Sequence, residues 1–152
     1  MTKSYLLLIF VLLFGIESFS QNCYDSANVY QFFLGNKKYE LVQEHKSWED
    51  AAACAVEHGG YLVHINSQDE QDSVYHHVAH LSGIDTAYIN VSDAGNVAYV
   101  WIGASDKFQE GAWIWDGNND DRGEQYWEGT GYGGGSVGDL FQNWGTKLNG
   151  NI

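Results

Sequence analysis

The most informative stretch of the chain is residues 100–117, which read Val-Trp-Ile-Gly-Ala-Ser-Asp-Lys-Phe-Gln-Glu-Gly-Ala-Trp-Ile-Trp-Asp-Gly. Aromatic and β-branched residues are concentrated at both ends of it, and such residues favour strands. We therefore expect one strand over residues 99–103 and another over residues 112–115, closed by the turn pair Asp116-Gly117.

Two helices are predicted upstream, and each opens with a capping box, in which a hydroxyl and a carboxylate satisfy the first amides of a helix. Ser47 and Asp50 open the first, which carries a buried stripe and ends at Gly59-Gly60; the stripe consists of Trp48, Ala51, Ala52 and Ala55. Ser67 and Glu70 open the second, which ends at Gly83 and has an apolar face made of Val74, Val78 and Leu81.

The remaining pattern completes an α+β prediction. Residues 39–42 and 61–65 are typical of short strands, and residues 84–98 predict an irregular insertion. After residue 103 the sequence is rich in glycine and predicts long loops. An α+β domain with its chemistry at the loop end is therefore expected.

Three groups of residues resemble one known family, the C-type lectin-like domains. The first group resembles the first half of such a domain and consists of Trp48, Ala51, Gly60, Leu62, Ile65, Ser67 and Glu70. Its central signature is similar to residues 100–103 and 110–117, and its aromatic-Asn-Trp element is similar to Phe141, Asn143 and Trp144. The resemblance covers most of residues 39–144. It implies a C-type lectin-like fold with two helices, small antiparallel sheets and a long Gly-rich loop.

The family's principal calcium and sugar site has no counterpart in these residues. That site uses an acid-Pro-amide motif with a cis-proline and then a Trp-Asn-Asp strand, but the chain contains no proline and ends eight residues after Trp144. The family's last strand, and the cysteine that would pair with Cys54, are missing as well. We expect a domain truncated at its C-terminus, with a divergent domain that has lost the site as the alternative. In a truncated domain the strand at residues 39–42 would be without its partner, and we expect weak or no sugar binding by the chain alone.

Carboxylates around the second predicted turn are the candidate metal ligands. The resemblance places Asp106 and Glu110 at the family's auxiliary calcium site, while the alternative is that Asp106 only caps the turn and Glu110 is a structural acceptor. Residues 116–121 resemble a calcium loop, but the glycine and the bidentate glutamate of an EF-hand are absent, so we interpret them as a solvated acidic loop. Asn143 is a weak candidate for a ligand contact.

Charge, leader and cysteines describe an exported protein. The 152 residues carry a net charge of −13, which argues against nucleic acid as a partner. Residues 1–20 are typical of a secretory signal peptide cleaved after Ser20, with an uncleaved anchor as the alternative. Cys23 and Cys54 either form one disulfide or both stay free, and their spacing does not decide between these.

Several short matches do not predict chemistry. Residues 129–134 fit a dinucleotide fingerprint and residues 134–138 a nucleophile elbow, but neither has the required strand–turn–helix context. His76 and His80 are spaced for zinc, yet a third ligand is missing, so an exposed helix face is the better interpretation. Burial is the default for the tryptophans of the strands, Trp101, Trp113, Trp115 and Trp127. Asn90 begins a glycosylation sequon that matters only in a eukaryotic source.

The sequence thus predicts a signal peptide at residues 1–20, a lead-in at 21–38 and a partial C-type lectin-like domain at 39–152. The resemblance implies a secreted module that binds carbohydrate or glycoprotein, with calcium when complete. A calcium-independent protein-binding or adhesion domain on the same fold is the alternative. An enzyme is not expected, because no nucleophile–base pair, catalytic metal set or carboxylate dyad can be placed.

Overall fold

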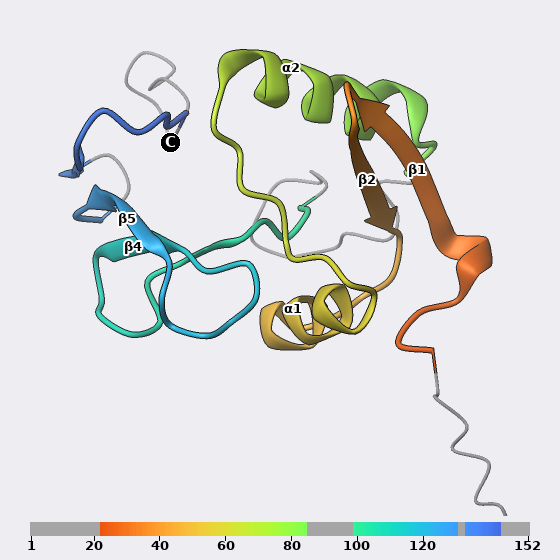
Figure 1. The fold of residues 1–152 in the computed structure, drawn as a ribbon, viewed down its shortest axis with the longest axis horizontal. Coiled ribbons are helices and arrows are strands. Elements are labelled where there is room, and N and C mark those ends of the chain that lie inside the picture. Colours follow the sequence, from red (N-terminus) through yellow and green to blue (C-terminus); the bar gives the residue numbers. More distant parts are fainter. Residues whose placement is uncertain (1–21, 85–98, 131–132, 144–152) are drawn as a thin grey trace, which may run out of the picture.

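A computed structural model describes residues 22–84, 99–130 and 133–143, and a β-hairpin lies near the start of the first of these ranges (Figure 1). After a 3-10 turn, η1 (Ser26–Asn28), strand β1 (Val29–Leu34) pairs antiparallel with β2 (Lys37–Val42). The expectation that residues 39–42 would lack a partner strand is therefore wrong. Residues 29–34, which we placed in a lead-in, form a strand rich in aromatic and β-branched residues, and the hairpin buries Phe32 of β1 and Leu41 of β2.

Both predicted helices are present, and both predicted N-caps are confirmed. Helix α1 (Trp48–Glu57) begins where the Ser47 hydroxyl accepts the Asp50 amide at 3.0 Å, and Gly59 follows its end with φ +78°. Helix α2 (Gln68–His76) begins with the same bond from the Glu70 amide to Ser67, at 3.2 Å. It continues as a π-helical turn, η2 (His77–Leu81), which is a feature that the apolar spacing did not predict.

Glu70 joins the hairpin to α2 and is 3% exposed. Its carboxylate accepts hydrogen bonds from the Tyr39 hydroxyl, from the Lys37 ammonium at 3.2 Å and from the Asn66 amide at 2.9 Å. Burial alone would raise the pKa of Glu70, but these donors hold the pKa below its ordinary value. The Glu70 carboxylate therefore accepts from Asn66 rather than from the N-cap amide of Ser67, and it ties β2 and the segment before α2 together.

Two predicted strands, residues 61–65 and 99–103, are wrong as strands. Both segments have the composition of strands, but no ladder joins them. Gly103 N donates to Val63 O at 2.9 Å, whereas Leu62 N donates to a third segment, at Gly117 O, at 3.0 Å. A strand needs consecutive bonds to one partner, and each of these residues bonds to a different segment. Only β3 (Ala104–Ser105) forms in this region.

The C-terminal sheet has four antiparallel strands in the order β3-β4-β5-β6. Strand β4 (Ala112–Trp115) was predicted, whereas β5 (Glu124–Glu128) and β6 (Gly135–Ser136) lie in sequence that we assigned to loops. Figure 1 shows this sheet at the end of the molecule opposite the hairpin, with α1 and the segments around residues 62 and 103 between them. The α+β prediction is confirmed. Within the described ranges no helix has both the length and the apolar character that a membrane span needs.

Candidate functional site

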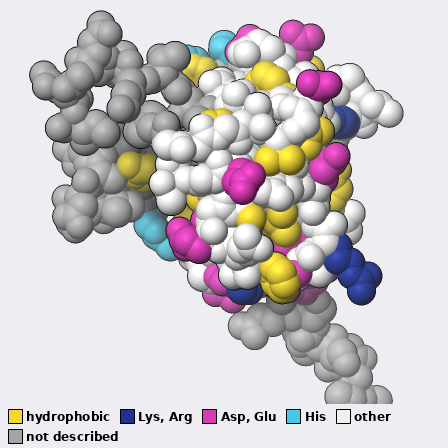
Figure 2. Space-filling view, turned by 90° about the vertical axis from the view of Figure 1, so that its left-hand side faces the viewer, with side chains coloured by type: hydrophobic (Ala, Val, Ile, Leu, Met, Phe, Trp, Pro, Cys, Tyr) yellow, Lys and Arg dark blue, Asp and Glu magenta, His cyan; other side chains and the backbone are white. Residues whose placement is uncertain are grey.

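The loops that connect the strands of the C-terminal sheet form the candidate site. We define the loop face as the β3–β4 turn (residues 105–111) and the β4–β5 loop (residues 116–123). Figure 2 looks onto the side of the molecule where this sheet lies, and acidic side chains there are spread among hydrophobic ones and outnumber basic ones. The face is thus suited to a ligand that offers hydroxyl groups, a cation, or both.

The β3–β4 turn is held by its own hydrogen bonds. The Gly111 amide donates to Oδ2 of Asp106 at 3.2 Å, and Gly111 has a φ of +78°. The Lys107 amide donates to the Ser105 hydroxyl at 3.2 Å. Asp106 therefore caps the turn, as one of the two sequence interpretations proposed, and Glu110 is exposed at the other end.

The tip of the same turn presents an aromatic ring to solvent. Phe108 is 78% exposed, the largest value among the exposed large hydrophobic residues of the described chain. Lys107 beside it reaches Asn119 of the neighbouring loop at 3.4 Å and pairs with Glu49 at 3.8 Å. The turn therefore combines two carboxylates, one cation and one exposed ring on a backbone that is already ordered.

The β4–β5 loop is organised around a buried carboxylate. Asp116 is 1% exposed and accepts hydrogen bonds from the amides of Asp120 at 2.9 Å and Asp121 at 3.2 Å. Asn119 and Asp121 adopt left-handed conformations with φ of 56° and 58°. The interpretation as a solvated acidic loop is therefore wrong for Asp116, which turns inward because it satisfies the amides of its own loop, and holds for the exposed Asp120 and Asp121.

Three aromatic rings stack on one another next to the β4–β5 loop. Trp115 lies between His64, with ring centroids 4.5 Å apart, and Tyr126, at 4.4 Å. Burial lowers the pKa of His64 and raises that of Tyr126. Trp127 is also buried, at 8% exposure. Burial was expected for the tryptophans, but Trp113 and Trp115 are only half-buried, and Trp101 is 54% exposed while its indole N–H donates to Lys46 O at 2.8 Å.

The β3–β4 turn offers the type of ligand that calcium prefers, but too few such ligands. Carboxylate oxygens are what calcium prefers, but it takes six to eight oxygens. Asp106 and Glu110 supply two carboxylates, and one oxygen of Asp106 already accepts the Gly111 amide. In the part of the chain that the structure describes, the one close group of three metal-ligating side chains is Cys23, Cys54 and His58, away from this turn. Backbone carbonyls and water would have to complete a calcium site.

The other sequence candidates divide between described and undescribed residues. Asn143 is exposed in the coil after β6, whereas Trp144 and the sequon at Asn90 lie outside the described residues. A strand, β5, does precede residues 129–134, contrary to our expectation, but β6 rather than a helix follows, so the dinucleotide fingerprint stays rejected.

The histidines of the second helix have packing and surface roles. His76 and His80 are exposed, as expected, with ring centroids 5.5 Å apart. His77 instead stacks on Phe32 at 4.0 Å and shares a hydrogen bond of 2.8 Å with the Tyr30 hydroxyl. It therefore packs α2 and η2 against the hairpin.

Cys23 and Cys54 form a disulfide, with their Cα atoms 5.6 Å apart. This resolves the alternative that spacing left open. It also corrects the expectation drawn from the resemblance, in which Cys54 would need a cysteine further along the chain. The partner instead comes from the N-terminal side, and it ties the start of the hairpin to α1.

Comparisons with known proteins agree with this geometry. The family described as Lectin C-type domain matches residues 44–147, which include both helices and the loop face. C-type lectin domain family 4 member M of Nomascus concolor is 26% identical over 98 residues, covering 64% of this chain and 21% of that protein. Hemolymph lipopolysaccharide-binding protein of Periplaneta americana is 32% identical over 76 residues, covering 50% and 27%. CD209 antigen of Homo sapiens is 28% identical over 93 residues, covering 61% and 19%.

The chain thus aligns with only about a fifth to a quarter of the length of these relatives. No solved structure matches it.

Proposed function

The chain belongs to the family of C-type lectin domains, and from that membership we propose that it is a secreted module that binds carbohydrate or glycoprotein through its loop face. The observation that carries the proposal is the β3–β4 turn, which lies inside the family match and presents Asp106, Glu110 and the exposed ring of Phe108 on one ordered loop. An exposed aromatic ring suits the apolar C–H face of a sugar, and carboxylates suit its hydroxyls.

Binding, rather than catalysis, is the role that we propose. Its ligands would be held by a few side chains on a shallow face, and we expect weak affinity for these 152 residues because the family's acid-Pro-amide motif is not among them. Calcium, when bound, would supply a positive charge that sugar hydroxyls can coordinate, and Asp106 and Glu110 are the residues that would hold it.

Secretion is part of the proposal, and three features support it. Residues 1–20 have the composition of a signal peptide, and a disulfide suits an oxidising compartment. A relative from Periplaneta americana is named for hemolymph, which is an extracellular fluid. We propose a leader at residues 1–20, and we place the start of the folded domain at β1 rather than at residue 39, since β1 pairs with β2.

A calcium-independent mode is the second candidate, and one observation favours it. The carboxylates of Asp106 and Asp116 already accept backbone amides, so the two loops of the face are ordered without an ion. In that mode the exposed ring of Phe108 and the acidic side chains around it would contact a glycan or a protein directly.

Saturation-transfer NMR with a panel of sugars, in calcium and in chelator, distinguishes the two modes because it detects weak binding. Asp106→Asn and Glu110→Gln remove charge while keeping hydrogen-bonding shape, and Glu124→Gln on β5 is the matched control. Loss of the signals in chelator and in the first two variants, but not in the control, supports the calcium-dependent mode. Signals that persist in chelator support the second mode. No transfer to any sugar from folded protein contradicts the carbohydrate proposal.

A further inference from the structure

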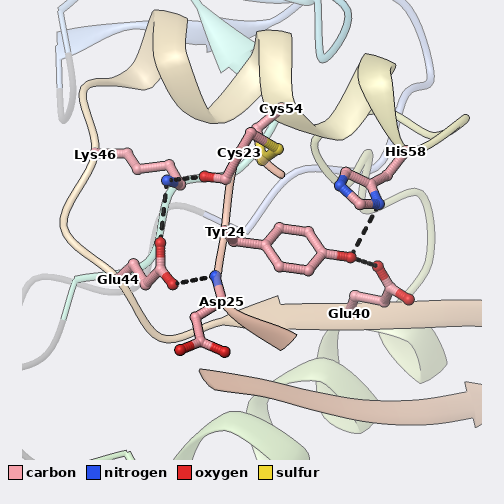
Figure 3. The surroundings of a disulfide bond; sticks show 8 residues. All are labelled: Cys23, Tyr24, Asp25, Glu40, Glu44, Lys46, Cys54 and His58. Carbon is pink, nitrogen blue, oxygen red and sulfur yellow. Dashed lines mark hydrogen bonds and ion pairs between the residues drawn. A yellow bond between two sulfur atoms is a disulfide. The ribbon is translucent and has the colours of Figure 1, made fainter. Parts of the chain in front are cut away.

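A histidine lies beside the disulfide. The ligand atoms of Cys23, Cys54 and His58 all lie within 4.8 Å of one another. Cys54 belongs to α1, His58 follows the end of the same helix, and Cys23 precedes the hairpin (Figure 3). Two cysteines and one histidine at such distances are a ligand set that zinc uses in proteins, once the sulfurs are reduced.

Cys23 is held in place by contacts that do not pass through its sulfur. Its carbonyl oxygen accepts a hydrogen bond of 2.6 Å from the Lys46 ammonium. The Asp25 amide donates to Glu44 Oε1 at 2.7 Å, and Lys46 in turn pairs with Glu44 at 3.2 Å. Figure 3 shows these contacts around the backbone of residues 23–25. None of these contacts involves the sulfur of Cys23, so they would keep the Cys23 thiol near Cys54 when the S–S bond is opened.

The tautomer of His58 follows from its neighbours. The Tyr24 hydroxyl donates its single proton to Glu40 Oε2 at 3.2 Å, so it can only accept from His58 Nδ1, which lies 3.0 Å away. A hydrogen bond from Lys38 lowers the pKa of Glu40, which therefore stays an acceptor at neutral pH. This arrangement favours the tautomer with the proton on Nδ1, in which Nε2 carries the lone pair that a metal ion needs. In Figure 3 the second ring nitrogen lies on the side of the ring nearer the cysteines.

This arrangement is the outer shell that metal-bound histidines have in proteins. A ligating imidazole donates its other N–H to an oxygen, which fixes the ring and raises its basicity. Here the Tyr24 hydroxyl would be that oxygen, and the Tyr24 ring stacks on His58 with centroids 4.3 Å apart. His58 is exposed and Cys23 is half-buried, so an ion can reach the site from solvent.

We propose that the reduced chain binds one Zn²⁺ through Sγ of Cys23, Sγ of Cys54 and Nε2 of His58, with water as the fourth ligand. Opening the disulfide takes two electrons and two protons from a dithiol, which itself becomes a disulfide. Zinc then displaces the two thiol protons to solvent. Disulfide and zinc exclude each other, so the site reports the redox state of its surroundings. This inference does not rest on the proposed sugar binding.

Cobalt(II) titration of the reduced protein tests the proposal, because a thiolate–cobalt bond has a charge-transfer band in the near ultraviolet. A phosphine reductant is used, which with water becomes the phosphine oxide and leaves two thiols. We expect one cobalt per chain, displaced by one zinc, and no band from the oxidised protein. His58→Ala should weaken the zinc affinity at least tenfold, whereas His80→Ala, at a surface histidine of η2, should not change it. Tyr24→Phe should weaken it about tenfold, as outer-shell changes do.

Three results would overturn the proposal. One is a reduced, folded wild type without a cobalt band. Another is a His58→Ala variant that binds zinc as tightly as wild type, because the two cysteine sulfurs would then account for the binding without His58. The third is loss of the far-ultraviolet circular dichroism on reduction, since the site requires the contacts of Lys46 and Glu44 to hold Cys23 in the open state.

Discussion

Replacement of Gly117 by alanine should loosen the junction between the helical part of the chain and the C-terminal sheet. A Cβ atom at Gly117 would lie 2.2 Å from the carbonyl oxygen of Leu62 and 3.0 Å from its amide nitrogen. Both are backbone atoms, so no flexible side chain can move aside. Gly117 is buried, and the close approach of the Leu62 backbone leaves no room for a side chain at this position.

The expected loss has two parts. Forcing the two backbones apart is overpacking, which costs about 1–3 kcal/mol. The same movement breaks the bond of 3.0 Å from Leu62 N to Gly117 O, and a hydrogen bond of this kind contributes about 1 kcal/mol. We therefore expect Gly117→Ala to lower the free energy of unfolding by roughly 2–4 kcal/mol.

Urea unfolding followed by tryptophan fluorescence measures this loss. Gly135→Ala is the matched control, because a Cβ atom there meets nothing within 4 Å. The control should stay within about 0.5 kcal/mol of wild type. A Gly117→Ala variant as stable as the control would refute the reasoning, since the close approach to Leu62 would then have no energetic consequence.

Three other changes test separate parts of the structure. Glu70→Gln should cost roughly 2 kcal/mol at pH 7, because it weakens charge-assisted hydrogen bonds to a buried group. Because the pKa of Glu70 is lowered in the folded protein, the stabilisation that its carboxylate gives is complete above the ordinary value of 4.5 and is lost as pH falls through the folded pKa. The free energy of unfolding of the variant should therefore differ less from that of wild type at pH 3 than at pH 7, and an equal difference at both pH values would contradict this. Ser47→Ala should cost about 1 kcal/mol in thermal unfolding by removing the cap of α1, and an unchanged melting temperature would argue against that cap. The double variant Cys23→Ser, Cys54→Ser opens a loop of 31 residues, and chain entropy predicts a loss of about 3.5 kcal/mol in urea; reduced wild type should lose the same amount.

Local signals in the sequence predicted the helices well. Ser47 and Ser67 each precede an acidic residue by three positions, and each serves as the N-cap that this pattern indicates. Gly59 and Gly83 both take positive φ after a helix, as expected for residues that end one. These features depend on neighbours in sequence, so one sequence suffices to find them.

Strands were harder, because they depend on distant partners. Residues 61–65 and 99–103 have strand composition, but each contributes only isolated bonds to the junction around Leu62 and Gly103. Strand β5 contains the buried Tyr126 and Trp127, yet the glycines around it predicted a loop. Strand β1 was overlooked because we took its residues for a lead-in to the domain.

The candidate site was predicted in part. Asp106 and Glu110 do bracket one ordered turn, as their spacing indicated, but the bond from Gly111 to Asp106 depends on the backbone path of the turn. The inward position of Asp116 could not be found from an acidic run in the sequence. The group of Cys23, Cys54 and His58 arises from the packing of α1 beside the start of the hairpin. The i, i+4 spacing of Cys54 and His58 is visible in the sequence, but spacing along the chain gave no signal that Cys23 would join them.

The most direct test of sugar recognition by the loop face is to locate the binding surface on the ¹⁵N-labelled protein. Backbone amide shifts would be followed by NMR while a sugar that gives saturation transfer is added, in calcium and in chelator. We predict shift changes concentrated in residues 105–111 and 116–123, with Phe108 and Glu110 among the largest. Changes confined to the hairpin or to α1, or no changes at saturating sugar, would contradict the assignment of the loop face as the ligand-binding surface.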